Sequence, residues 1–233
     1  MGDDMREGWV ITNLGEVCDV QRGLTYSGKD TVDISNSIVL RATNIDLTTN
    51  KLILEELKYL RNDLAIDDKY RVQKGALLIC FSSGSKEHLG KVAFIETDLG
   101  YYFGGFIGQI VPKSEIDPKY LFYNLISEDY KKYINRLTDG VNINNLTLTD
   151  LKKYQIPLPP LPEQEQMVSV LDSLSAELGQ LHQSYSSQLQ SLEELKKSIL
   201  QKAFSGELTR EKVSETRLAV FKDEQDLSIA AEP

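Results

Sequence analysis

Apolar residues in the C-terminal part of the chain recur at alternating steps of three and four, as they do in a coiled coil. Ten positions fit this register; eight of them are apolar, and the exceptions are Gln188 and Lys202. The pattern persists over more than four heptads, which favours a coiled-coil seam over an ordinary amphipathic helix. The eight apolar positions are Leu171, Leu174, Leu178, Leu181, Tyr185, Leu192, Leu195 and Ile199.

A proline block separates this pattern from the rest of the chain. Residues 157–162 read Pro-Leu-Pro-Pro-Leu-Pro, and Glu163 and Gln164 follow. Proline breaks a helix interior but fits the first helical turn, so the block predicts where a long helix begins. We predict an α+β protein in three parts. These are a mixed α/β domain over residues 1–160, a single long coiled-coil helix over 161–207, and a charged tail over 208–233.

Short β-like runs and polar loops alternate in the first part. Residues 9–20 predict two short strands joined by a turn at 14–16. Residues 76–95 begin with an unbroken apolar run and predict a hairpin whose first strand is buried. A glycine-rich β-like segment follows at 101–111, and helical spacing predicts two helices between 118 and 137.

The charge is distributed unevenly between the parts. The net charge is −9, of which residues 1–160 carry −3 and residues 161–233 carry −6. Neither part is basic enough for strong non-specific binding to DNA, because that affinity comes from phosphates neutralised by Lys and Arg. A nucleic-acid site would therefore need its basic residues on one face, or a partner that supplies positive charge.

Membrane, secretory and metal-binding patterns are missing from the sequence. No run of 18 apolar residues predicts a membrane span, and the first residues do not resemble a signal peptide, so we expect a cytoplasmic protein. Cys18 and Cys80 lie far apart and outside metal spacing, which predicts two reduced, partly buried thiols. His88 and His182 have no ligand set around them, and no metal site is predicted.

Three polar loops of the first part carry side chains suited to DNA. Asn can pair with adenine, Arg or Lys with guanine, and Ser with phosphate or a base. An ordinary polar turn is the alternative for each loop, and their joint presence adds modest support to DNA binding. The candidates are Arg22, Tyr26 and Lys29 in the first loop, Ser82, Ser83, Ser85, Lys86 and Lys91 in the second, and Asn142, Asn144 and Asn145 in the third.

Catalysis by this chain is disfavoured. Residues 83–86 match the Ser-x-x-Lys spacing of serine acylases, but they lie in a predicted hairpin loop and not at the start of a helix. The glycines of residues 103–108 lack the G-x-G-x-x-G pattern and precede a strand-like run. No Asn/Asp-Pro-Pro-Tyr/Phe tetrapeptide of the amino-methyltransferases occurs. A standalone enzyme is therefore the weakest of the alternatives.

Several segments of the chain form a recognisable combination. The most specific are the proline block with Glu163-Gln164 and the ending Ala-Phe-Ser-Gly-Glu-Leu at 203–208. Shorter ones are Trp9 with Leu-Gly-Glu-Val at 14–17, Lys-Gly-Ala-Leu-Leu at 74–78, and Asn145-Leu146. Together, over roughly residues 8–208, they resemble the specificity (S) subunit of type I restriction–modification systems.

The resemblance implies a non-catalytic subunit with a target-recognition domain and a helical spacer. Such a subunit binds double-stranded DNA and recruits modification subunits, which carry S-adenosylmethionine and methylate adenine. Restriction subunits that join the complex use ATP with Mg. The resemblance therefore implies no cofactor in this chain and places these cofactors on partner subunits.

The chain departs from the usual family pattern because it has one recognition domain and one helical region in place of two. It resembles a half-size S subunit. Antiparallel two-fold pairing of two copies would bury the leucine seam. Two identical domains in that arrangement would read a bipartite palindromic site, since the symmetry of the site mirrors that of the protein. The alternative from another class is a coiled-coil adaptor whose globular domain binds protein.

Overall fold

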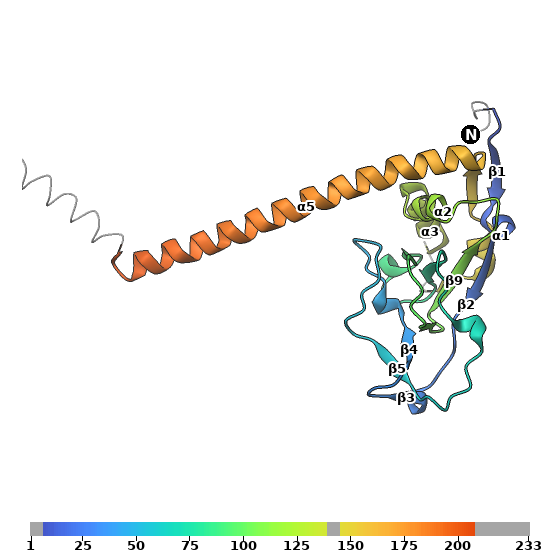
Figure 1. Ribbon diagram of the computed structural model, residues 1–233, viewed down its shortest axis with the longest axis horizontal. Helices are drawn as coiled ribbons and strands as arrows, with labels where there is room; N and C mark the ends of the chain where they lie inside the picture. The colour runs from blue at the N-terminus through green and yellow to red at the C-terminus, as the bar shows by residue number, and fades with distance from the viewer. Residues whose placement is uncertain (1–6, 139–144, 208–233) are drawn as a thin grey trace, which may run out of the picture. The chain divides into compact units, whose positions relative to one another are not determined.

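The computed structural model describes residues 7–138 and 145–207, and the chain divides into two compact units (Figure 1). The first unit spans residues 1–171 and the second spans residues 172–233. The boundary lies inside the last helix, α5 (Leu161–Phe204). The predicted tail over 208–233 lies outside the described residues.

A central antiparallel sheet with the strand order β2-β9-β6-β7 organises the first unit. Its strands are β2 (Cys18–Arg22), β9 (Ile107–Pro112), β6 (Leu77–Cys80) and β7 (Val92–Phe94). All six residues of 76–81 are buried, as expected for a strand covered on both faces. The predicted hairpin over 76–95 is confirmed, since β6 pairs with β7 in antiparallel register.

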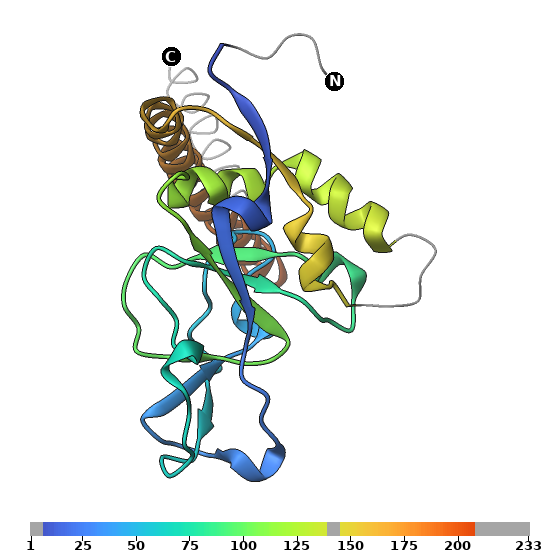
Figure 2. The same cartoon turned by 90° about the vertical axis from the view of Figure 1, so that its right-hand side faces the viewer.

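Helices cover one face of this sheet (Figure 2). They are α1 (Leu14–Val17), α2 (Pro118–Leu125), α3 (Glu128–Thr138) and α4 (Leu148–Lys152). Because side chains alternate along a strand, β6 turns Leu77 and Ile79 toward these helices, where they pack with Leu121 and Ile134. The two helices predicted between 118 and 137 are confirmed as α2 and α3.

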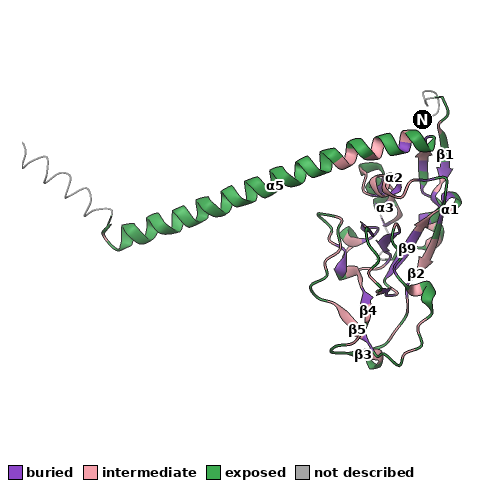
Figure 3. Ribbon diagram, viewed as in Figure 1, coloured by how far each residue is buried: buried purple, intermediate pink, exposed green. Residues whose placement is uncertain are grey.

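A second sheet covers the other face, with the strand order β3-β5-β4-β8. Its strands are β3 (Thr31–Val32), β5 (Lys58–Leu60), β4 (Ser37–Leu40) and β8 (Tyr102–Phe103). Only the β4–β8 pair is parallel. Leu78 of β6 packs with Leu40 and Phe103 from this sheet in a second buried cluster. Buried residues are thus concentrated between the layers (Figure 3).

The start of the first unit pairs with its end. Strand β1 (Val10–Asn13) lies antiparallel to β10 (Gln155–Leu158). The turn predicted at 14–16 is one turn of helix, α1, and helix α4 was not predicted from the sequence. The predicted α+β class with a long C-terminal helix is confirmed. None of the described helices is long and apolar enough to cross a membrane.

The first turns of α5 are fixed to the globular core through Gln164. Its side chain is fully buried. Nε2 donates to the carbonyl oxygens of Pro159 (2.8 Å) and Glu115 (3.1 Å), and Oε1 accepts from the amide of Asp117 (2.8 Å). One amide side chain therefore satisfies three backbone groups between the proline block and the loop before α2.

Replacing Gln164 with Ala should lower the free energy of unfolding by about 3 kcal/mol, because buried backbone groups lose their partners. Urea denaturation followed by circular dichroism measures the change. Gln166→Ala is the matched control, since Gln166 is exposed on the same helix, and it should change stability by less than about 0.5 kcal/mol. Equal stability of the two variants would contradict the anchoring role of Gln164.

Both cysteines are free and buried. Burial raises the pKa of the Cys18 thiol to about 12, against an ordinary value of 9.0. Above pH 9.0 the unfolded chain therefore releases a proton that the folded chain keeps, and stability falls as the pH rises toward 12. Between pH 9 and 11 the free energy of unfolding of Cys18→Ala should therefore fall less steeply than that of the wild type. The two slopes should differ by up to about 1.4 kcal/mol per pH unit. Urea titrations across that range, with pH 6–8 as the internal control, measure the difference.

Candidate nucleic-acid interface

Arg22, the last residue of β2, is held by three contacts. Its guanidinium carbon lies 4.7 Å from the centroid of the Phe81 ring. Nη2 donates to the carbonyl oxygen of Leu146 (2.6 Å) and to Oδ1 of Asn145 (3.1 Å). A cation over an aromatic face and two hydrogen bonds fix an otherwise flexible side chain in one position. The backbone pairs Arg22 with Gly108 of β9, which places this group at the end of the central sheet.

Asn145 joins Arg22 to the residue that follows Phe81. An isolated β-bridge pairs Ser82 with Asn145, and the amide of Leu146 donates to the carbonyl oxygen of Phe81 (2.7 Å). The Ser82 hydroxyl donates to Oδ1 of Asn145 (2.5 Å). We call Arg22, Phe81, Ser82 and Asn145 the donor cluster. It joins residues from all three predicted loops, which lie far apart in the sequence.

The donor cluster determines what Asn145 can offer to a ligand. Its Oδ1 already accepts from Arg22 and Ser82, so both lone pairs are used. No residue within 7–138 or 145–207 accepts a hydrogen bond from its Nδ2, and Asn145 is exposed. The two-point pairing of Asn with adenine needs a free acceptor as well as a donor. Asn145 as held here can only donate.

Two glycines allow this close arrangement. A Cβ at Gly108 would overlap the Phe81 ring, and a Cβ at Gly23 would overlap the carbonyl oxygens of Phe103 and Gly104. The Phe81 ring can therefore lie beneath Arg22 only because position 108 lacks a side chain. The glycines of residues 101–111 serve backbone and ring packing.

Phe106 lies next to the donor cluster and was missing from the sequence-based candidates. It occupies the turn between β8 and β9, and its carbonyl oxygen accepts from the amides of Phe81 (2.9 Å) and Ser82 (3.1 Å). Its side chain is 70% exposed, although the neighbouring Phe103 and Ile107 are fully buried. The glycine-rich run at 101–111 contains four aromatic residues, and nothing in the sequence shows that Phe106 is the exposed one.

The other candidates are distributed around the first unit. Tyr26 packs against the turn at Gly104, and burial raises the pKa of its phenol. Lys29 is exposed in a short 3-10 turn, η1 (Gly28–Asp30), before β3. Ser83 and Ser85 form a local turn in which the Ser85 amide donates to the Ser83 hydroxyl (3.3 Å). Asn142 and Asn144 lie outside the described residues.

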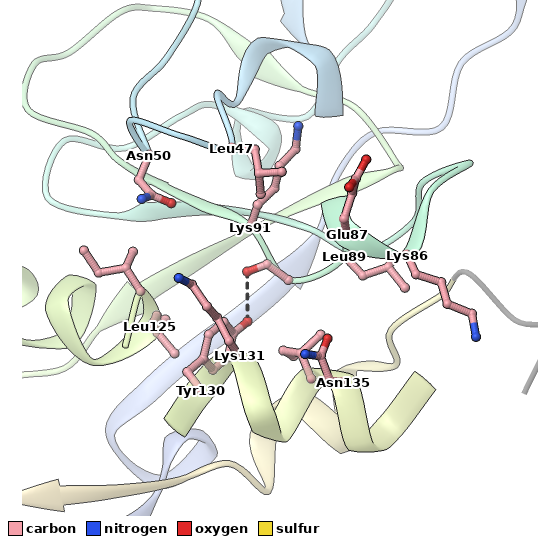
Figure 4. A pocket seen from close by; sticks show the side chains of 13 residues that line it. Leu47, Asn50, Lys86, Glu87, Leu89, Lys91, Leu125, Tyr130, Lys131 and Asn135 are labelled. Atoms are coloured by element: carbon pink, nitrogen blue, oxygen red, sulfur yellow. Dashed lines mark hydrogen bonds between the residues drawn. The ribbon is translucent and has the colours of Figure 1, made fainter. Parts of the chain in front are cut away.

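Lys86 and Lys91 line a separate hollow of about 340 Å³ beside α3, together with Lys131 (Figure 4). Each ammonium group already has a partner. Lys86 donates to the Thr138 carbonyl (3.1 Å), Lys91 to the Ile45 carbonyl (2.7 Å), and Lys131 to Glu128 (2.9 Å). The three side chains point away from one another in Figure 4. The structure thus does not gather these lysines into an anion site, and burial lowers the pKa of Lys91.

The helix seam is exposed in the second unit. All its members beyond Leu171 are between 48% and 66% exposed, while Leu171 is half-buried and belongs to the first unit. Leu189, Leu200 and Phe204 are also exposed but fall outside the heptad register. Residues 173–205 are exposed throughout (Figure 3). Exposed leucines at heptad spacing need another helix to cover them.

Among the residues that the structure describes, no group of three His, Cys, Asp or Glu side chains is placed to hold a metal ion.

Comparison with known proteins identifies the family. The model of the type I restriction modification DNA specificity domain matches residues 6–191, and the chain belongs to this family. The specificity subunit of the type I restriction enzyme EcoKI from Escherichia coli K12 is 29% identical over 220 residues, covering 93% of this chain and 47% of the relative. The StySPI specificity subunit from Salmonella potsdam is 29% identical over 206 residues, with 87% and 44% covered. The chain thus spans about half the length of the curated relatives it matches.

The fold has relatives among solved structures as well. One match is a chain from a structural study of complex assembly and conformational transition in the type I R-M system. Its TM-score is 0.67 at 22% identity, and the match covers 87% of this chain and 47% of that chain. At this identity the likeness supports the fold alone.

Proposed function

We propose that this chain is a DNA sequence-specificity subunit of a type I restriction–modification complex. It binds double-stranded DNA through the donor cluster and carries no catalytic residues of its own. The observation that supports this most directly is that Arg22, Ser82 and Asn145, which lie far apart in the sequence, meet on one patch of a domain of the specificity family. Arg and Asn donors held in fixed positions are the groups that read base edges in the major groove.

The proposed complex needs partners. Modification subunits would bring S-adenosylmethionine and methylate adenine, and restriction subunits would bring ATP with Mg. The exposed seam and the additional apolar residues Leu189, Leu200 and Phe204 offer more surface than one coiled-coil stripe uses. The negative charge of residues 161–233 suits contact with protein and not with phosphate.

Pairing of two copies is part of the proposal. A two-fold pair of α5 helices would bury the seam of both copies, and two copies of one recognition domain would select a bipartite palindromic site. The dimer would work in the cytoplasm, where DNA and S-adenosylmethionine are both available.

Selection from a library of duplexes with 30 randomised base pairs tests the proposal with the full 233-residue chain, alone and with a modification subunit. We expect enrichment of one motif in two inverted half-sites. If no motif is enriched in either condition, DNA recognition is contradicted. Recovery of protein partners without any motif would instead support the adaptor alternative.

A further inference from the structure

The turn at residues 104–107 holds Phe106 rigidly beside the donor cluster. The amide of Ile107 donates to the Gly104 carbonyl (2.9 Å), and the Ile107 carbonyl accepts from the amide of Gly23 (3.0 Å). The amide of Gly104 donates to the Leu40 carbonyl (2.9 Å). Together with the two bonds to the Phe106 carbonyl, these contacts tie the turn to β2, β4 and the end of β6.

The backbone on both sides of Phe106 is hydrogen-bonded to neighbouring elements, while its ring is 70% exposed. Single exposed apolar side chains are common, and Ile34, 82% exposed before β4, is one in this chain. Phe106 differs because its own carbonyl bonds the amide of Ser82, the residue whose hydroxyl orients Asn145. The backbone of Phe106 therefore lies one residue away from Asn145 in this chain of hydrogen bonds, and its exposed ring belongs to the same surface region.

The chemistry of the neighbouring groups selects the part of DNA that the ring can contact. Asn145 and Arg22 offer donors, which suit the N7 and O6 acceptors of guanine in the major groove. In that groove the apolar feature of a base pair is the C5-methyl group of thymine, and Phe is among the side chains that contact it. The minor groove offers no such group.

We propose that Phe106 is a specificity-determining residue that contacts the C5-methyl group of a thymine next to the base read by Asn145. This inference rests on the proposed function and extends it to one atom of the DNA. Burial of the ring against the methyl group adds affinity for sites with thymine at that position. Because the ring is uncharged, the contact releases no counterions and leaves the salt dependence of binding unchanged.

Substitution of thymine by deoxyuridine removes the methyl group and nothing else, so it tests the contact directly. The probe is the duplex enriched by the full chain, with each thymine replaced in turn, and fluorescence anisotropy measures its Kd. At one thymine we expect the wild-type chain to lose about fourfold in affinity, the ratio that burial of one methyl group supplies. Phe106→Ala should bind the unmodified duplex about tenfold more weakly and should be insensitive to the same replacement.

Two controls separate the possible outcomes. Ile34→Ala removes another exposed apolar side chain, from the segment before β4, and should bind like the wild type. Phe106→Leu keeps an apolar group and should retain most of the discrimination. If a motif is enriched but Phe106→Ala binds it normally, or loses affinity while still sensing every methyl group, the contact is refuted and the proposed function stands. If no motif is enriched, the proposed function itself fails.

Discussion

Replacing Asn145 with Asp should weaken binding of the enriched duplex by at least tenfold and shift the preferred base pair at one position. Asp has nearly the same shape and keeps an oxygen for the Arg22 and Ser82 donors, so the donor cluster should remain in place. Its second oxygen replaces the Nδ2 donors by an acceptor with negative charge. That oxygen repels guanine N7 and O6 and the phosphates, and it favours the amino groups of cytosine or adenine.

Competition anisotropy over a set of duplexes that vary one base pair measures both effects. Asn135→Asp is the matched control, because Asn135 is exposed on α3 and gains the same charge away from the cluster. It should reduce affinity by no more than about twofold. Unchanged affinity and base preference in Asn145→Asp would remove Asn145 from the interface, provided that circular dichroism shows both variants folded.

The double substitution Leu181→Asp and Leu192→Asp should convert the proposed dimer to a monomer. Both residues lie in the seam, 52% and 61% exposed in the single chain. In a paired helix each Asp would lose the apolar burial of a leucine, about 2 kcal/mol, and would bring a carboxylate into a dry interface. The substitutions occur in both copies, so at least four unfavourable sites would act together.

Sedimentation velocity at micromolar concentration measures the oligomeric state. Gln183→Asp provides the control, since Gln183 is on the opposite side of the heptad and adds the same charge. It should leave the dimer intact. The monomeric variant should keep a folded first unit, because that unit has its own core. An unchanged oligomeric state would show that the register assigned to the seam is wrong.

Local patterns in the sequence were sufficient for the hairpin over 76–95 and for helices α2, α3 and α5. The apolar run at 76–81 identified a strand buried on both faces, and heptad spacing identified α5. Local patterns were not sufficient for α1 and α4, which are 4 and 5 residues long. Helices this short have almost no stability of their own and form because the core packs against them.

The candidate site was only partly predictable. Arg22 and Asn145 were named from their side-chain chemistry, but nothing in the sequence placed them together. Lys86 and Lys91 have the same chemistry as a DNA-binding lysine, yet their ammonium groups donate to the backbone carbonyls of Thr138 and Ile45. The sequence shows which groups a loop carries, and it does not show which groups already have a partner.

By itself, the sequence predicted a globular part followed by a long helix, a heptad register for the leucines of that helix, and the family that the chain resembles. These features depend on residue spacing over a few turns or on a proline at a helix start. Only the tertiary structure decided that Arg22 lies over Phe81 and that Phe106 remains exposed. It also decided that Asn145 can offer a ligand only the hydrogen-bond donors of its Nδ2, because its Oδ1 is already bonded. Arg22 and Asn145 are 123 residues apart, and pairing across such a distance depends on the packing of the whole domain.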